Sequence, residues 1–197
     1  MDEIEILITQ LGCRWIIGGK KPREDAITKL VEIGEPAVPA LIKKLKELNL
    51  LQQKRFMTLD DIEGSNRNIH SGIWSVLVNM GLAAVPSLIE ALNDGLGKMR
   101  MDAFRILKKV LDNCVTIEEV NGFERKLREG MVHLNKGKVG GIKVTTADID
   151  VARLGLAAAD RKNSLASKRD ILLDDISKPP KKGGVYQSIR TERMRNG

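Results

Sequence analysis

The sequence predicts an all-α protein of the α-α superhelix class, a helical-repeat solenoid in which pairs of helices stack on one another. Three observations predict this fold class. Apolar residues make up 42% of the 197 residues but aromatic residues only 3%, so the core must be aliphatic. The apolar residues recur at helical spacing. One segment also repeats along the chain, and internal repeats of this size are typical of stacked helical arrays.

The internal repeat appears when the segment from Pro22 is aligned with the segment from Ile69. The copies share a glycine, a proline and several aliphatic positions, which pair as Leu30 with Leu77, Gly34 with Gly81, Ala37-Val38-Pro39 with Ala84-Val85-Pro86, Leu41-Ile42 with Leu88-Ile89, and Leu45 with Leu92. A partial third copy follows, in which Ala103, Phe104 and Leu107 take the places of Ile73, Trp74 and Leu77. Matches at so many positions rarely arise by chance.

Each copy predicts two antiparallel helices joined by a short turn. Gly34 ends the first helix, because glycine tolerates the left-handed conformation of a helix C-terminus. Pro39 and Pro86 mark the start of the second helix, because proline fits the first helical turn. The second helix then buries an apolar stripe made of Val38, Leu41, Ile42 and Leu45.

The pattern divides the chain into four parts. Residues 1–21 form an N-terminal cap helix, with Ile4, Leu7, Ile8 and Leu11 on one side, and residues 22–115 hold the repeats, with an insertion over 49–69. Residues 116–176 form divergent C-terminal helices: one opened by a capping box at Thr116 to Glu119, one starting at Thr145 to Asp148, and a short last helix over 165–176. Residues 177–197 are predicted to be a disordered basic tail, because they hold too little apolar material to fold.

Two stretches, REDAITKLVEIGEPAVPALIKKLKE and IHSGIWSVLVNMGLAAVPSLIEALND, resemble the HEAT-like repeat family first associated with phycobilisome lyases. The first copy fills the family's pattern with Arg23, Ala26, Leu30, Gly34, Val38, Pro39, Leu41 and Ile42. The second copy has His70 in place of the arginine, and the third has Arg100 but lacks the glycine and the proline. The resemblance implies a concave surface lined by second helices. It also implies that the repeat arginines pair with acidic residues of a neighbouring repeat.

Charge and cysteine content restrict the class of protein. The net charge is +7, and the excess lies after residue 115, because residues 1–115 are almost balanced. Cys13 and Cys114 have no second ligand at metal or disulfide spacing, which indicates a reducing, cytoplasmic environment. The acidic start does not resemble a signal peptide, and uninterrupted apolar runs are shorter than the roughly 20 residues of a membrane span, so no membrane is expected.

No cofactor or metal site is predicted. The glycine and lysine segments 18–21 and 137–141 do not match the P-loop spacing, and His70 and His133 are too few for a metal cluster or an evident acid–base centre. Trp74 is expected to be core, since it aligns with Ile27 and Phe104, whereas Trp15 has no counterpart in the other copies.

Candidate partner-binding residues lie in two places. Lys43, Lys44 and Lys46 lie on the expected concave side of a second helix, with Glu90 at the matching place of the next repeat, although a solvated surface is the simpler explanation. The basic tail offers Lys181, Lys182, Arg190, Arg193 and Arg195, which could attract nucleic acid or an acidic protein, and a solubilising tail explains them equally well.

Three functions are compatible with this pattern. The leading hypothesis is a non-enzymatic scaffold or adaptor that binds another protein on the concave face. The alternative is a nucleic-acid-binding accessory protein that uses the basic C-terminal part. The third, a lyase or DNA glycosylase, rests on family analogy alone, because no catalytic constellation is visible in the sequence.

Overall fold

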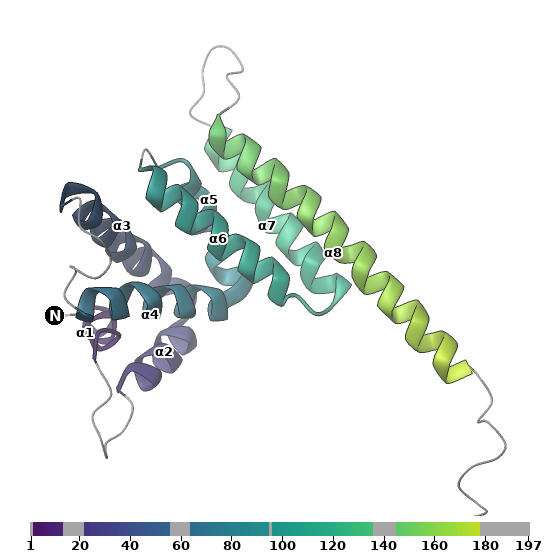
Figure 1. Cartoon of the computed structure of the whole chain (residues 1–197), viewed down its shortest axis with the longest axis horizontal. Helices are drawn as coiled ribbons and strands as arrows, with labels where there is room; N and C mark the ends of the chain where they lie inside the picture. Colours follow the sequence, from purple (N-terminus) through teal and green to yellow (C-terminus); the bar gives the residue numbers. More distant parts are fainter. Residues whose placement is uncertain (1, 14–21, 56–63, 95, 136–144, 178–197) are drawn as a thin grey trace, which may run out of the picture. The chain divides into compact units, whose positions relative to one another are not determined.

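The computed structural model describes residues 2–13, 22–55, 64–94, 96–135 and 145–177, and their regular structure is entirely helical (Figure 1). This confirms the all-α prediction for the described part of the chain. The α-helices are α1 (Glu3–Gln10), α2 (Pro22–Ile33), α3 (Val38–Arg55), α4 (Gly64–Met80), α5 (Val85–Leu92), α6 (Gly97–Asn113), α7 (Ile117–Asn135) and α8 (Thr146–Ser177). Two short 3-10 turns, η1 (Glu35–Ala37) and η2 (Gly81–Ala84), precede α3 and α5.

The chain divides into two compact units, Met1–Lys162 and Asn163–Gly197. The first contains α1 to α7 and the first half of α8. The described part of the second is the remainder of α8, residues 163–177. Every buried residue of the described chain lies at or before Ala158, so the whole described core belongs to the first unit.

The turn inside each helix pair follows the predicted chemistry. Gly34 and Gly81 have φ angles of 71° and 59°, in the left-handed region that favours glycine. Each glycine ends or follows a first helix, and each second helix then begins with a Val-Pro pair, at Val38 and Val85. The same local sequence therefore produces the same helix–turn–helix in both copies.

The helices of each copy pack against both helices of the next copy. Within the first unit, α2 contacts α4 and α4 contacts α6, while α3 contacts α5 and α5 contacts α7. Each second helix also contacts the next first helix, α3 with α4 and α5 with α6. The predicted aliphatic positions fill the space between them: Leu30, Leu41, Leu45, Leu77, Leu88 and Ile89 are all buried. The core is aliphatic as expected, with Phe123 of α7 as its one fully buried aromatic side chain among the described residues.

The N-terminal helix α1 contacts α2, α3 and α4 through its apolar side. Leu11, directly after α1, is fully buried and lies against Gly72 of α4. A Cβ atom at position 72 would lie 2.9 Å from the Cβ of Leu11, closer than real Cβ contacts allow, so the glycine permits this approach.

The capping box predicted at Thr116 to Glu119 is formed, and a second one begins α8. The Thr116 hydroxyl accepts the Glu119 backbone N–H at 3.1 Å, and the Glu119 carboxylate accepts the Thr116 N–H at 3.1 Å. Thr145 and Asp148 make the same reciprocal pair, with N–H to oxygen distances of 2.6 and 3.3 Å. These contacts fix the starts of α7 and α8.

The insertion predicted over 49–69 is helical wherever it is described, because α3 continues to Arg55 and α4 begins at Gly64. One predicted helix boundary is wrong. The separate helix expected over 165–176 is part of α8, which runs without a break to Ser177. No proline interrupts α8, and its lone Gly155 costs only about 1 kcal/mol of helix propensity, which is too little to end a helix.

The stretch Asn66–Leu92 has the length of a membrane-spanning segment, with 27 residues, and its most apolar 18-residue window has a mean hydropathy of 1.7. Half of its most apolar window is buried within the protein. The stretch is also divided between α4 and α5 by the turn at Gly81. Length and composition alone are weak evidence for a membrane span, because the core helices of water-soluble proteins satisfy the same test.

Candidate functional site

The lysines predicted on the concave side are largely neutralised. Lys44 pairs with Glu47 at 3.3 Å on the same helix, and Lys46 pairs with Asp94 at 2.6 Å, after α5. Burial alone would raise the pKa of Asp94, but hydrogen bonds from Lys46 and from the Leu96 N–H, together with the lysine charge, hold it below its ordinary value. Lys46 therefore serves to connect two helix pairs.

Among the other predicted partner-binding residues, the structure describes Lys43 and Glu90, which are exposed on α3 and α5. Trp15 lies outside the described part of the chain, and so do the tail residues Lys181, Lys182, Arg190, Arg193 and Arg195. The glycine and lysine segments 18–21 and 137–141 also lie outside it.

One position of the repeat makes the same kind of contact in all three copies. Arg23 of α2 donates to the Ser71 hydroxyl of α4 at 2.6 Å. His70 of α4 lies 3.1 Å from the Asp102 carboxylate of α6. The third member, on α6, contacts α8: Arg100 donates to the Thr146 hydroxyl at 2.7 Å and pairs with Asp150 at 3.5 Å. The position thus joins each first helix to a later helix.

The repeat arginines were expected to pair with acidic residues of a neighbouring repeat. Arg100 does pair with a carboxylate, but with that of Asp150 on α8, outside the predicted repeats. Arg23 instead meets a hydroxyl, because α4 contains no acidic residue to receive it. Its Nε is buried without a hydrogen-bond partner.

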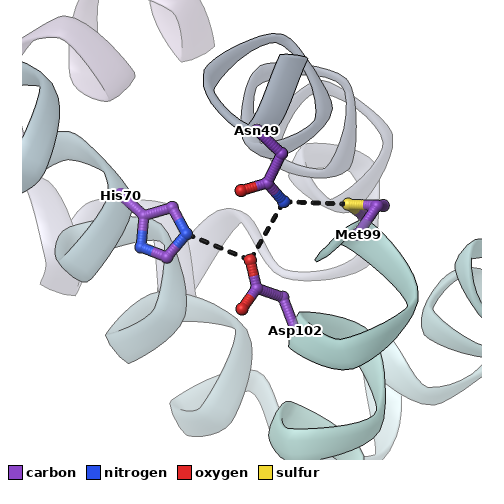
Figure 2. A network of polar contacts seen from close by, with 4 residues as sticks. All are labelled: Asn49, His70, Met99 and Asp102. Carbon is purple, nitrogen blue, oxygen red and sulfur yellow. Dashed lines mark hydrogen bonds and ion pairs between the residues drawn. The ribbon is translucent and has the colours of Figure 1, made fainter. Parts of the chain in front are cut away.

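A buried polar network joins α3, α4 and α6 (Figure 2). Asn49 and Asp102 are only 1% and 5% exposed, and the Asn49 amide donates to the Asp102 carboxylate at 2.9 Å. The same amide nitrogen lies 3.7 Å from the sulfur of Met99, while His70 Nε2 approaches the carboxylate from the other side. The Asn49 carbonyl oxygen is buried without a partner.

The network stabilises the charged form of Asp102. Burial alone would raise the pKa of this carboxyl. Hydrogen bonds from His70 and Asn49, with electrostatic interactions from His70 and Lys98, outweigh burial and hold the pKa below its ordinary value. Asp102 is therefore a carboxylate at neutral pH, and its Oδ2 atom makes the contacts to both Asn49 and His70.

A groove opens beside this network, between α4 and α6. This α4–α6 groove has a volume of about 680 Å³ and includes His70, Trp74 and Val78 on the α4 side and Asp102, Arg105 and Lys109 on the α6 side. Its volume lies within the range of ligand sites in proteins. Residue-by-residue reading of the sequence missed the groove, because its two walls come from different repeats.

Trp74 is not the core residue that the sequence predicted. It is half-buried and lines the α4–α6 groove, and its equivalents Ile27 and Phe104 are half-buried too. This repeat position therefore lies at the edge of the first-helix layer rather than inside it. The indole Nε1 of Trp74 is buried and has no hydrogen-bond partner.

The hydroxyl groups of the groove are not arranged for nucleophilic catalysis. The Ser71 hydroxyl accepts a hydrogen bond from Arg23, and the Ser75 hydroxyl donates one to the Ser71 carbonyl oxygen. Within the described residues, no hydrogen bond joins either hydroxyl to His70, the base that a serine nucleophile would need. The described residues also contain no group of three or more His, Cys, Asp or Glu side chains that could hold a metal ion.

Cys114, directly after α6, is a poor nucleophile. Its thiol is buried and donates to the Val110 carbonyl oxygen at 3.5 Å. Burial raises the pKa of this thiol, as does the nearby charge of Glu119, and the opposing charge of Arg161 does not offset them. The thiol is therefore protonated near neutral pH, and a protonated thiol reacts slowly.

Comparison with known proteins identifies no relative. No protein-family model, no curated protein and no solved structure matches the chain. The resemblance to HEAT-like repeats stays a prediction from the sequence, and the function has to be argued from the geometry of the groove.

Proposed function

We propose that this chain is a non-enzymatic protein-binding scaffold, built as a short solenoid of HEAT-like repeats. The observation that carries the proposal is the α4–α6 groove, an open surface lined by Trp74 and by two cations, Arg105 and Lys109, that make no hydrogen bond or ion pair within the described residues. Buried polar side chains, in contrast, connect helices to one another, as Asp102 does with Asn49 and His70. An open binding surface, formed by helices that buried polar contacts hold together, is typical of a scaffold.

The repeat arrangement supports the solenoid part of the proposal. First helices contact first helices and second helices contact second helices, which is the pattern of stacked helix pairs. The contacts of Arg23, His70 and Arg100 recur at one repeat position. Because Lys44 and Lys46 are paired with carboxylates, the proposed binding surface lies in the groove rather than on the second helices.

Co-purification tests the scaffold function. A tagged full-length chain, cross-linked and purified from the cells that make it, should recover one protein partner in stoichiometric amount that the untagged control does not. Size-exclusion chromatography of the recovered complex should then give a single species. Recovery of nucleic acid without protein would contradict the proposal.

A nucleic-acid accessory protein is the second candidate, favoured by the basic character of two neighbouring helices. Helix α4 has one arginine and no acidic residue, and α6 has five lysines or arginines against two aspartates. Labelled DNA and RNA should then bind at low salt and dissociate as salt rises. Titration of the labelled DNA and RNA with the full chain and with a chain that lacks residues 177–197 shows whether the tail or the two helices supply the affinity. If neither nucleic acid binds at low salt, this function is excluded.

A further inference from the structure

Positive and negative side chains are unevenly distributed among the helices of the repeats. Residues 1–115 are almost neutral, yet α4 and α6 together hold six basic and two acidic residues. One of these acids, Asp102, is buried and bonded to Asn49 and His70. The neighbouring first helix α2 is different, with two basic residues against three acidic ones. Helix α3 is as basic, with five lysines or arginines against one glutamate, but two of its lysines, Lys44 and Lys46, are paired with carboxylates. The two helices that form the groove therefore carry a net positive charge although residues 1–115 are almost neutral.

Two cations of the groove are available for a ligand. Arg105 and Lys109 lie one helical turn apart on α6, and both are exposed. Within the described part of the chain, neither side chain makes a hydrogen bond or an ion pair, in contrast to Lys44, Lys46 and Arg100. The two groups present a pair of positive charges at the opening of the groove.

The opposite wall offers apolar surface. Trp74 and Val78 lie one turn apart on α4 and line the groove. Trp74 is half-buried, so the exposed part of its side chain can contact a ligand. Tryptophan and arginine are also the residues that most often dominate protein interfaces.

We propose that the α4–α6 groove binds a short acidic segment of a partner protein, with an apolar side chain against Trp74 and Val78 and carboxylates at Arg105 and Lys109. This inference rests on the scaffold function proposed above. The groove volume of about 680 Å³ suits a few residues rather than a folded domain. Acidic protein is favoured over single-stranded nucleic acid because the groove offers one aromatic side chain, whereas nucleic-acid grooves provide successive stacking platforms.

A random-peptide display library panned on the full chain tests the proposal. The enriched peptides should combine Asp or Glu with Leu, Ile or Phe. The double variant R105E/K109E should capture them at least about tenfold more weakly, since it replaces both cations with anions. The matched control K29E/K43E makes the same charge change at exposed lysines of α2 and α3 and should bind as the parent does. Circular dichroism confirms that both variants fold.

Trp74 provides a direct readout of the site. The Trp15→Phe variant leaves Trp74 as the single tryptophan, because the chain has two. An enriched peptide should change the fluorescence of Trp74, and its counterpart with glutamine in place of glutamate should bind at least about tenfold more weakly at physiological salt. A short oligothymidylate is titrated in parallel. Tighter binding of the oligothymidylate, lost in R105E/K109E, would overturn the protein partner in favour of nucleic acid.

The outcomes separate this inference from the scaffold function. Enrichment of basic peptides, or of none, overturns the inference, and so does capture that R105E/K109E does not weaken. In each case, co-purification of a stoichiometric protein would still uphold the scaffold function, with its binding surface elsewhere. If the chain recovers no protein partner either, the scaffold function fails as well.

Discussion

The side chain of Asp102 joins three helices, and its removal should be costly. Asp102→Ala deletes the acceptor of Asn49 and His70 and leaves the buried Asn49 amide without its oxygen partner. We expect the free energy of unfolding, measured by urea denaturation, to fall by about 2–4 kcal/mol. The control Asp112→Ala changes an exposed aspartate on the same helix and should cost less than about 0.5 kcal/mol. Equal losses in the two variants would contradict this role for Asp102.

The lowered pKa of Asp102 predicts a loss of stability in acid. Its carboxyl binds protons more readily in the unfolded chain than in the folded one. Its contribution is therefore complete above the unfolded pKa of about 3.9 and disappears as the pH falls through the folded pKa. The stability difference between the parent and Asp102→Asn should therefore shrink as the pH falls below about 4. A difference that stays constant throughout the acid range would show that Asp102 is not the titrating group.

The sequence itself indicates that Asp102 and Asn49 are buried. The apolar stripe of α6 runs through Met99, Ala103, Ile106 and Leu107, and Asp102 lies within it. Asn49 likewise follows Leu45 and Leu48 on the buried side of α3. A polar residue inside an apolar stripe predicts a buried hydrogen bond, because an unpaired buried polar group is costly. The stripe does not identify the partner, which comes from a different repeat.

At the scale of helices, Gly130 determines how closely α7 approaches α5. A Cβ atom at position 130 would lie 2.5 Å from Cδ1 and 3.1 Å from Cβ of Ile89. Gly130→Val should therefore lower the free energy of unfolding by about 2–3 kcal/mol through overpacking. Gly155→Val is the matched control, because a Cβ at position 155 of α8 meets nothing within 4 Å. Thermal denaturation compares the two, and similar melting temperatures would contradict the close contact.

Helix starts were more predictable from the sequence than helix lengths. The capping pair of Thr116 and Glu119 and the turn at Gly34 depend on neighbours within a few residues, so local sequence determines them. The extent of α3 and α8 depends instead on summed propensity and on packing, both of which act over many residues. Asn49, the first residue of the predicted insertion, is buried within α3, and α8 continues past residue 165, where a separate helix was expected to begin.

At the scale of the whole molecule, the α4–α6 groove could not be predicted from single helices. Trp74 and Arg105 are separated by a complete second helix, and only the packing of α4 on α6 makes them parts of one surface. The net charge of residues 1–115 does not reveal the basic character of this surface, because acidic residues elsewhere in that range balance it. The internal repeat predicted which helices are neighbours. It did not predict the groove between α4 and α6.

The first half of α8 belongs to the folded core, and the rest should be dispensable for stability. Its buried residues are Ala147, Val151, Leu154 and Ala158, all within the first compact unit, and Lys162 pairs with Glu124 of α7 at 2.7 Å. A chain shortened to residues 1–166 should unfold in urea within about 1 kcal/mol of the full chain. A chain shortened to 1–144 should lose about 4–6 kcal/mol, because burying each large aliphatic side chain contributes about 1.5–3 kcal/mol. A loss of that size is comparable to the whole stability of many domains, so the shorter chain should be largely unfolded. Equal stability of the two truncated chains would show that α8 is not part of the core.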